Sequence, residues 1–122
     1  MKYTRIVATA DDSSRFEDAE FEMSTRIVVE GVPPMLVSSP VGVSGAIFVE
    51  QPEGATDWQA HVAPRRQFIF IVSGRVAVET SDGERREFGP GSVVSAEDTV
   101  GKGHVSTPLT DDVRLVMLPL TG

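Results

Sequence analysis

The stretch HVAPRRQFIFIVSG, residues 61–74, places a histidine, two arginines and a glutamine directly before an apolar run that ends at a glycine. The next stretch, RVAVET at 75–80, is again rich in β-branched side chains. Such residues favour the pleated backbone of a strand, and glycine supplies the positive φ of a tight turn. The two runs therefore predict a pair of strands that meet at Gly74, with polar side chains at the start of the first.

Short β-rich runs of the same kind recur along the chain, separated by turn-forming segments such as EGVPP, FGPGS and GKG. This pattern is typical of an all-β sandwich or barrel. The predicted strands lie within 5–10, 26–30, 43–50, 86–88, 92–96, 104–107 and 113–120. The segment 11–23 shows no clean helical stripe, because Phe16 and Phe21 are five residues apart, and we expect an irregular acidic arm within about 1–40.

Composition limits the classes of function. A chain of 122 residues with 40% hydrophobic content fits one domain spanning 1–122. The net charge of −7 disfavours binding to nucleic acid and to anionic membranes. Without cysteine there is no disulfide, thiolate ligand or cysteine nucleophile. The amino terminus lacks the apolar core of a secretory signal, and no run approaches the roughly 18 apolar residues of a membrane span, so we expect a cytoplasmic protein.

Residues of about 54–108 resemble the cupins, small β-barrels with two sequence motifs around one site. His61, Gln67 and Gly74 keep the spacing of the first motif, although Ala63 and Gln67 stand where that motif has histidine and glutamate. The turn 89–92, GPGS, is similar to the start of the second motif, and His104 falls about two residues late.

The resemblance implies a single-domain cupin β-barrel, or jelly roll, with the acidic arm at its amino-terminal end. It also implies a divalent metal such as Fe, Mn, Zn or Ni, held by His61, Gln67 and His104, and oxygenase-like or isomerase-like chemistry on a small molecule. Two imidazoles and a neutral amide are a weaker set than the three histidines and one glutamate of the full motif.

Strand alternation gives the site its expected shape. Residues two apart point to the same face, so 61, 63, 67, 69 and 71 form one inward row, polar at the mouth and apolar at depth. Each expected ligand has a structural alternative: His61 and His104 could bond to backbone or water, and Gln67 could be a satisfied buried amide. Ala63 offers no lone pair and opens space, which favours a metal-free module that binds a carboxylated or aromatic metabolite.

Glu97 and Asp98 stand before a glycine-flanked turn near the predicted mouth. Either could act as a general base or as a fourth ligand, and a metal-free lyase, isomerase or cyclase could use them with a histidine. The alternative is that both are solvated or capping groups.

Two further residues are candidate ligand contacts. Arg65 could bind a carboxylate with its guanidinium fork. Alternation sends Arg65 and Arg66 to opposite faces, so at most one of them lines the site, and Pro64 could change which one. Otherwise the two form a surface pair bonded to the acidic arm. Trp58 could stack on a ligand or close the barrel end. The predicted strands 67–73 and 113–120 are apolar on both faces, which indicates a homodimer.

Overall fold

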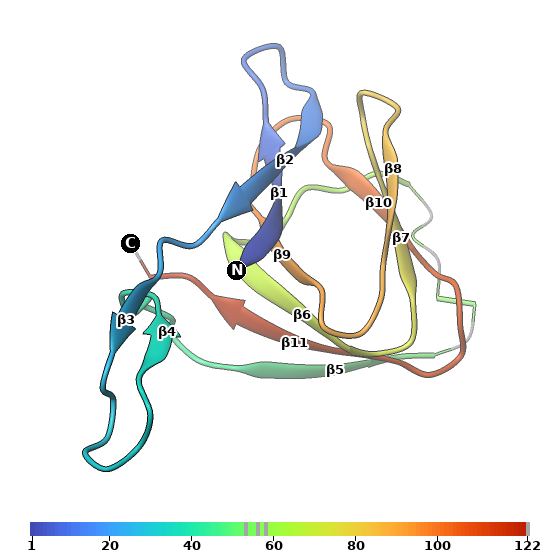
Figure 1. The fold of residues 1–122 in the computed structure, drawn as a ribbon. Helices are drawn as coiled ribbons and strands as arrows, with labels where there is room; N and C mark the ends of the chain where they lie inside the picture. Colours follow the sequence, from blue (N-terminus) through green and yellow to red (C-terminus); the bar gives the residue numbers. More distant parts are fainter. Residues whose placement is uncertain (53, 56, 58, 122) are drawn as a thin grey trace.

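The computed structural model describes residues 1–52, 54, 55, 57 and 59–121, and in these residues it contains strands and no helix. Two sheets face each other and close into a barrel, and a small hairpin projects away from it (Figure 1). The strands are β1 Lys2–Ala8, β2 Ser14–Glu20, β3 Ser24–Arg26, β4 Met35–Val37, β5 Ile47–Gln51, β6 Gln67–Ser73, β7 Val76–Thr80, β8 Arg85–Phe88, β9 Val93–Ala96, β10 His104–Pro108 and β11 Val113–Pro119. The predicted all-β barrel is confirmed.

The larger sheet has the order β2-β1-β9-β6-β11-β5, and β6 lies at its centre between β9 and β11. Its pairs are antiparallel except that β1 runs parallel to β9. The apolar run from Phe68 to Val72 thus occupies a central strand. Ile69 and Ile71 face the barrel interior, whereas Val72 on the other face is 55% exposed.

The smaller sheet has the order β10-β7-β8. Gly74 makes the turn by which the chain leaves the larger sheet and enters the smaller one. Its φ is +75°, and a Cβ there would lie 2.8 Å from the Cα of Val113. The turn predicted at this glycine therefore requires glycine for two reasons, positive φ and close approach.

The hydrophobic core lies between the two sheets. The larger sheet contributes Ile6, Ile71, Val94 and Leu115, and the smaller sheet contributes Val76, Val78 and Phe88. These side chains fill the deep part of the barrel and leave its other part for polar groups.

The prediction of an irregular arm within 11–23 is wrong, because Ser14–Glu20 forms strand β2. Its residues pair in register with β1, from Lys2 opposite Glu20 to Ala8 opposite Ser14. Ser14 and Phe16 are buried while Arg15 is exposed, so the strand alternates despite its acidic composition. Propensity failed here because pairing with β1 and burial of Phe16 decide the conformation.

The outer face of the larger sheet is covered only in part. Tyr3 and Phe21 stack with ring centroids 4.3 Å apart, and both rings lie within 6.0 Å of the Phe68 ring. Further along the sheet, Phe48 is 80% exposed. The hairpin β3–β4, which Figure 1 shows projecting from the barrel, also exposes apolar side chains, including Ile27 and Leu36.

In the part of the chain that the structure describes, no helix has the length and apolar character needed to cross a membrane. The cytoplasmic location stays a prediction from the sequence.

Candidate functional site

A cavity of about 290 Å³ occupies the barrel interior between the two sheets. Its deep part is apolar and includes Ile69, Ile71, Val78, Leu115 and Met117. Its other wall is polar and includes Gln51, Asp57, His61, Arg65, Gln67, His104 and Ser106. The cavity therefore suits a small ligand with one apolar and one polar end.

The row predicted from strand alternation lines this cavity. His61, Ala63, Gln67, Ile69 and Ile71 all contribute to its wall. The polar members come before or at the start of β6, and the apolar members lie further along it. The sequence therefore predicted both the inward face and its change from polar to apolar.

His61 and His104 come from distant parts of the chain and pair through their backbones. His61 N donates to His104 O at 3.0 Å, and His104 N donates to His61 O at 2.9 Å. Their ring centroids lie 5.0 Å apart, with the ring planes at 56°. This bridge adds the segment at His61 to the free edge of β10 and fixes the two imidazoles side by side.

Hydrogen bonds hold the His61 ring at both nitrogens. Nε2 lies 2.8 Å from Oδ2 of Asp57, and Nδ1 lies 3.0 Å from the carbonyl oxygen of Val62. Burial alone would lower the pKa of His61, but the Val62 carbonyl and the Asp57 carboxylate stabilise the charged ring and leave the pKa above its ordinary value.

His104 is buried in the cavity wall, and Asp98 lies behind it. Nδ1 of His104 is 2.6 Å from Oδ2 of Asp98, whose side chain is fully buried. The main-chain oxygen of Asp98 also accepts a hydrogen bond from Ala63 N at 3.0 Å. Because Nδ1 binds Asp98, Nε2 is the ring nitrogen of His104 that is available to a ligand.

The two arginines lie on opposite sides of the wall, as alternation predicts. Arg65 lines the cavity, and its Nη1 donates to Oε1 of the buried Gln67 at 3.1 Å. A guanidinium nitrogen of Arg66 instead lies 3.6 Å from the Glu97 carboxylate. Of the two, Arg65 is thus the one placed to contact a ligand in the cavity.

Glu97 and Asp98, both candidate bases, also point in opposite directions. Arg5 donates to both carboxylate oxygens of Glu97, at 2.8 and 3.1 Å, and Ser95 Oγ donates to one of them at 2.9 Å. The hydrogen bonds from Arg5 hold the pKa of Glu97 below its ordinary value despite partial burial. Glu97 belongs to this ion-pair cluster on the outer side of β1 and β9 and not to the cavity lining, whereas Asp98 reaches the cavity through His104.

Three polar residues of the cavity were not predicted from the sequence. Asp57 accepts from Ser106 N at 2.7 Å as well as contacting His61, so it ties the loop before His61 to β10. Ser106 follows His104 by two residues and could have been found by alternation. Gln51 reaches the cavity through the pairing of β5 with β11, which no local sequence pattern reveals.

Trp58, the predicted stacking residue, lies outside the residues that the structure describes.

The predicted metal ligands His61, Gln67 and His104 reach one cavity, but the set does not fit a divalent ion as arranged. Both His61 nitrogens face oxygen atoms of the protein, and the Gln67 oxygen accepts from a cationic guanidinium. Among the described residues, no three His, Cys, Asp or Glu side chains are grouped so that they could share a metal. A metal site needs about three convergent protein donors, so no step proposed below uses a metal.

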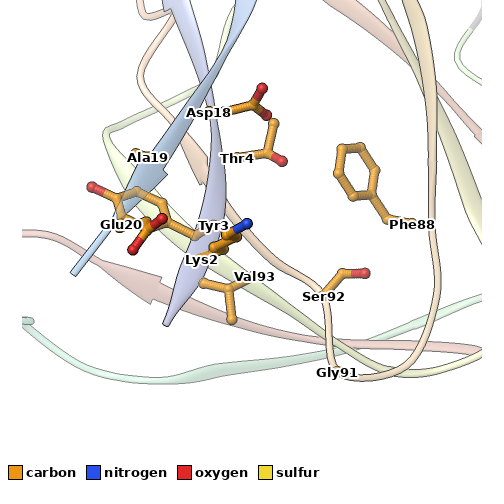
Figure 2. A pocket seen from close by; sticks show the side chains of 10 residues that line it. All are labelled: Lys2, Tyr3, Thr4, Asp18, Ala19, Glu20, Phe88, Gly91, Ser92 and Val93. Carbon is orange, nitrogen blue, oxygen red and sulfur yellow. The ribbon is translucent and has the colours of Figure 1, made fainter. Parts of the chain in front are cut away.

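A second and larger hollow, of about 610 Å³, lies between β1–β2 and the turn from β8 to β9 (Figure 2). Its lining includes Lys2, Asp18 and Glu20, and it contains none of the residues predicted for the site. Phe88 lines this groove as well as the interior cavity, so its ring stands between the two spaces. The interior cavity has the buried polar groups that ligand recognition requires, and it is the candidate site.

Comparison with known proteins agrees with this architecture. No curated protein sequence gives a significant match to the chain. The family model described as the EutQ-like cupin domain matches residues 38–110, which is more than half of the chain. This range includes the predicted strand pair at Gly74 and both histidines of the cavity. The two-sheet barrel, the position of the cavity and the family match together establish that the chain belongs to the EutQ-like cupin domain family.

Proposed function

We propose that this cupin domain binds a small organic acid in its barrel cavity without a metal. The carboxylate of the acid faces the polar wall, and its hydrocarbon part occupies the apolar end. A volume of about 290 Å³ corresponds to roughly ten water molecules at the liquid volume of about 30 Å³ each, which suits a small metabolite.

The observation that carries the proposal is that Arg65 lines the cavity without an acidic partner among the described residues. Its guanidinium lines the cavity, and the hydrogen bond it makes goes to the neutral amide of Gln67. Within the described parts of the chain, no acidic side chain forms an ion pair with Arg65. Arg65 is an exposed residue at the polar end of the cavity, and a guanidinium binds a ligand carboxylate through two parallel hydrogen bonds.

Gln51 adds a requirement on the ligand. Its Oε1 is buried in the cavity region with no hydrogen-bond donor among the described residues. A buried acceptor without a donor is destabilising by about 1 to 3 kcal/mol, so a ligand hydroxyl that donates to Gln51 would relieve this penalty. We therefore favour an acid that also has a hydroxyl group.

The metal-dependent oxygenase or isomerase is the weaker of the two functions considered from the sequence. It needs His61, Gln67 and His104 as ligands, whereas His61 and Gln67 make hydrogen bonds within the protein that compete with a metal.

A thermal shift assay with chelator present tests the proposal. We expect 4-hydroxybenzoate to raise the melting temperature and 4-hydroxybenzamide, which has the same shape without the charge, to have little effect. Arg65→Gln should weaken binding of the acid about 10- to 100-fold, from the loss of a charge-assisted contact. Arg66→Gln is the matched control and should retain binding. Equal responses to the acid and the amide, or a response that requires added metal, would overturn the proposal.

We also propose that the domain forms a homodimer through the outer face of the larger sheet. Phe70 pairs with Val116, and Val116 pairs with Phe48, so three apolar residues form a row across β6, β11 and β5. Phe48 points outward, and the hairpin β3–β4 also exposes apolar side chains. Exposed apolar surface of this kind favours contact with another apolar surface, which a second copy of the chain supplies.

A further inference from the structure

Binding of an acid by Arg65 does not use the pair formed by Asp98 and His104. Asp98 is fully buried, and its Oδ1 has no hydrogen-bond partner among the residues described. The Oδ2 contact of 2.6 Å with Nδ1 of His104 is therefore the side-chain hydrogen bond that this carboxylate makes here. A buried carboxylate needs a donor, so Nδ1 of His104 carries a proton, and Nε2 is the ring nitrogen left to the cavity.

His61 has the opposite arrangement. Both of its ring nitrogens face acceptors, Asp57 Oδ2 at 2.8 Å and the Val62 carbonyl at 3.0 Å. Only a ring that carries a proton on each nitrogen satisfies both contacts, so this geometry favours the imidazolium cation. The two main-chain hydrogen bonds between His61 and His104 hold this cation beside a basic imidazole, with 5.0 Å between the ring centroids.

A base next to two cationic side chains is suited to forming an enolate. The base removes a proton from a carbon beside a carbonyl, and nearby positive charge stabilises the oxygen that becomes negative. Of the described side chains that line the cavity, His104 is the imidazole base, and His61 and Arg65 supply positive charge. The Asp57 carboxylate is engaged by His61 and by Ser106 N.

We propose that the cavity catalyses keto–enol proton transfer on a small 2-oxo acid, with His104 as the catalytic base and Asp98 as its positioning residue. This inference rests on the proposed binding of an acid by Arg65, and it names the substrate class. The enol hydroxyl is also the donor that the buried Gln51 oxygen lacks.

The reaction balances without another reactant. The C3–H bond of the oxo acid breaks, the proton goes to Nε2 of His104, and the bonding electrons form a C2–C3 double bond as the C2 carbonyl electrons move to oxygen. Transfer of the proton from Nε2 to that oxygen gives the enol, and its transfer back to C3 restores the oxo acid. In deuterated water, the Nε2 proton exchanges with solvent, so C3 becomes deuterated.

The test follows deuterium incorporation at C3 of 2-oxobutyrate by proton NMR, with chelator present and binding measured separately by calorimetry. We expect the wild-type protein to accelerate exchange above the buffer rate and to have no effect on 2-butanone, which lacks the carboxylate. His104→Gln should reduce the exchange rate about 100-fold or more while changing 2-oxobutyrate affinity by only a few-fold. Asp98→Asn should also reduce exchange with little change in affinity.

Nitrogen-15 NMR of the histidine rings distinguishes positioning by Asp98 from a merely structural role, and it does not depend on whether the His104 variant folds. We expect the wild-type His104 proton on Nδ1, and in Asp98→Asn we expect it on Nε2, because the amide NH₂ of asparagine donates to Nδ1. A wild-type proton on Nε2 would overturn the inference. If 4-hydroxybenzoate binds but 2-oxobutyrate does not exchange above the buffer rate, the inference is also overturned and the proposed function stands. If no carboxylate binds, the proposed function fails first.

Discussion

Gly103 passes so close to His61 that a Cβ at position 103 would overlap the carbonyl group of His61. Gly103 also has a φ of +73°, a backbone conformation that residues with a Cβ rarely adopt. The close backbone approach is the step that allows His104, the next residue, to pair with His61. The position of both imidazoles therefore depends on a residue that has no side chain.

Gly103→Ala should destabilise the fold by about 3 to 5 kcal/mol, from left-handed strain together with the overlap at His61. Gly83→Ala is the matched control, because Gly83 has a φ of +93° and a methyl group added there would meet no atom within 4 Å. Gly83→Ala should lower the free energy of unfolding by only about 1 to 2 kcal/mol, which is the cost of left-handed strain alone. Urea unfolding measures both, and equal losses would contradict the close approach.

Glu97→Gln should destabilise the fold by about 1 to 2 kcal/mol at pH 7. Breaking a fully buried ion pair would cost more, but Arg5 is 35% exposed and solvent screens its charge. Since folding lowers the pKa of Glu97, its stabilisation is complete above the unfolded pKa of about 4.3 and is lost as the pH falls through the folded value. The gap between the wild type and the variant should therefore close in acid. Glu50→Gln, at a side chain that is 81% exposed, should change stability by less than about 0.5 kcal/mol. Thermal unfolding across pH 3 to 7 measures these differences, and a constant gap would argue against the ion pair.

Phe48→Glu should convert the proposed homodimer to a monomer, because it places a charge at the β5 end of the apolar row on the larger sheet, on its most exposed side chain. Val100→Glu provides the control, since Val100 is 61% exposed but lies near the turn before β10. Light scattering after size-exclusion chromatography reports the mass of each variant. A monomeric wild-type protein at micromolar concentration would remove the dimer.

Protein purified from metal-containing medium should hold well below one divalent ion per chain, because His61 and Gln67 use their donor atoms within the protein. Elemental analysis measures this, and zinc or nickel should leave the melting temperature unchanged. The contrary result is one equivalent of metal that survives dialysis and disappears in His104→Ala.

Much of this site follows from local sequence patterns. Alternation through His61, Gln67 and Ile71 predicts one face of the cavity, because a strand that is paired on both sides has little freedom to change that alternation. The same rule, applied one step further, would have separated Glu97 from Asp98, since neighbouring residues point to opposite faces. The sequence prediction treated the two acids as alternatives in a loop and missed this difference.

The remaining parts depend on contacts between distant residues. Gln51 enters the cavity because β5 pairs with β11 in one particular register. Asp57 becomes part of the site because Asp57 and His61 each form hydrogen bonds with β10, at Ser106 and His104. Strand β2 was missed for the same reason. An acidic segment with weak β propensity becomes a strand when its backbone can form hydrogen bonds with a neighbouring strand, here β1.

Phe88 has a consequence for how molecules reach the interior. Phe88 lines both the inner cavity and the outer groove, so its ring stands where the two spaces adjoin. Replacing this ring with a methyl group would open a path between the two spaces, and solvent could then enter the apolar end of the barrel from the side of β1.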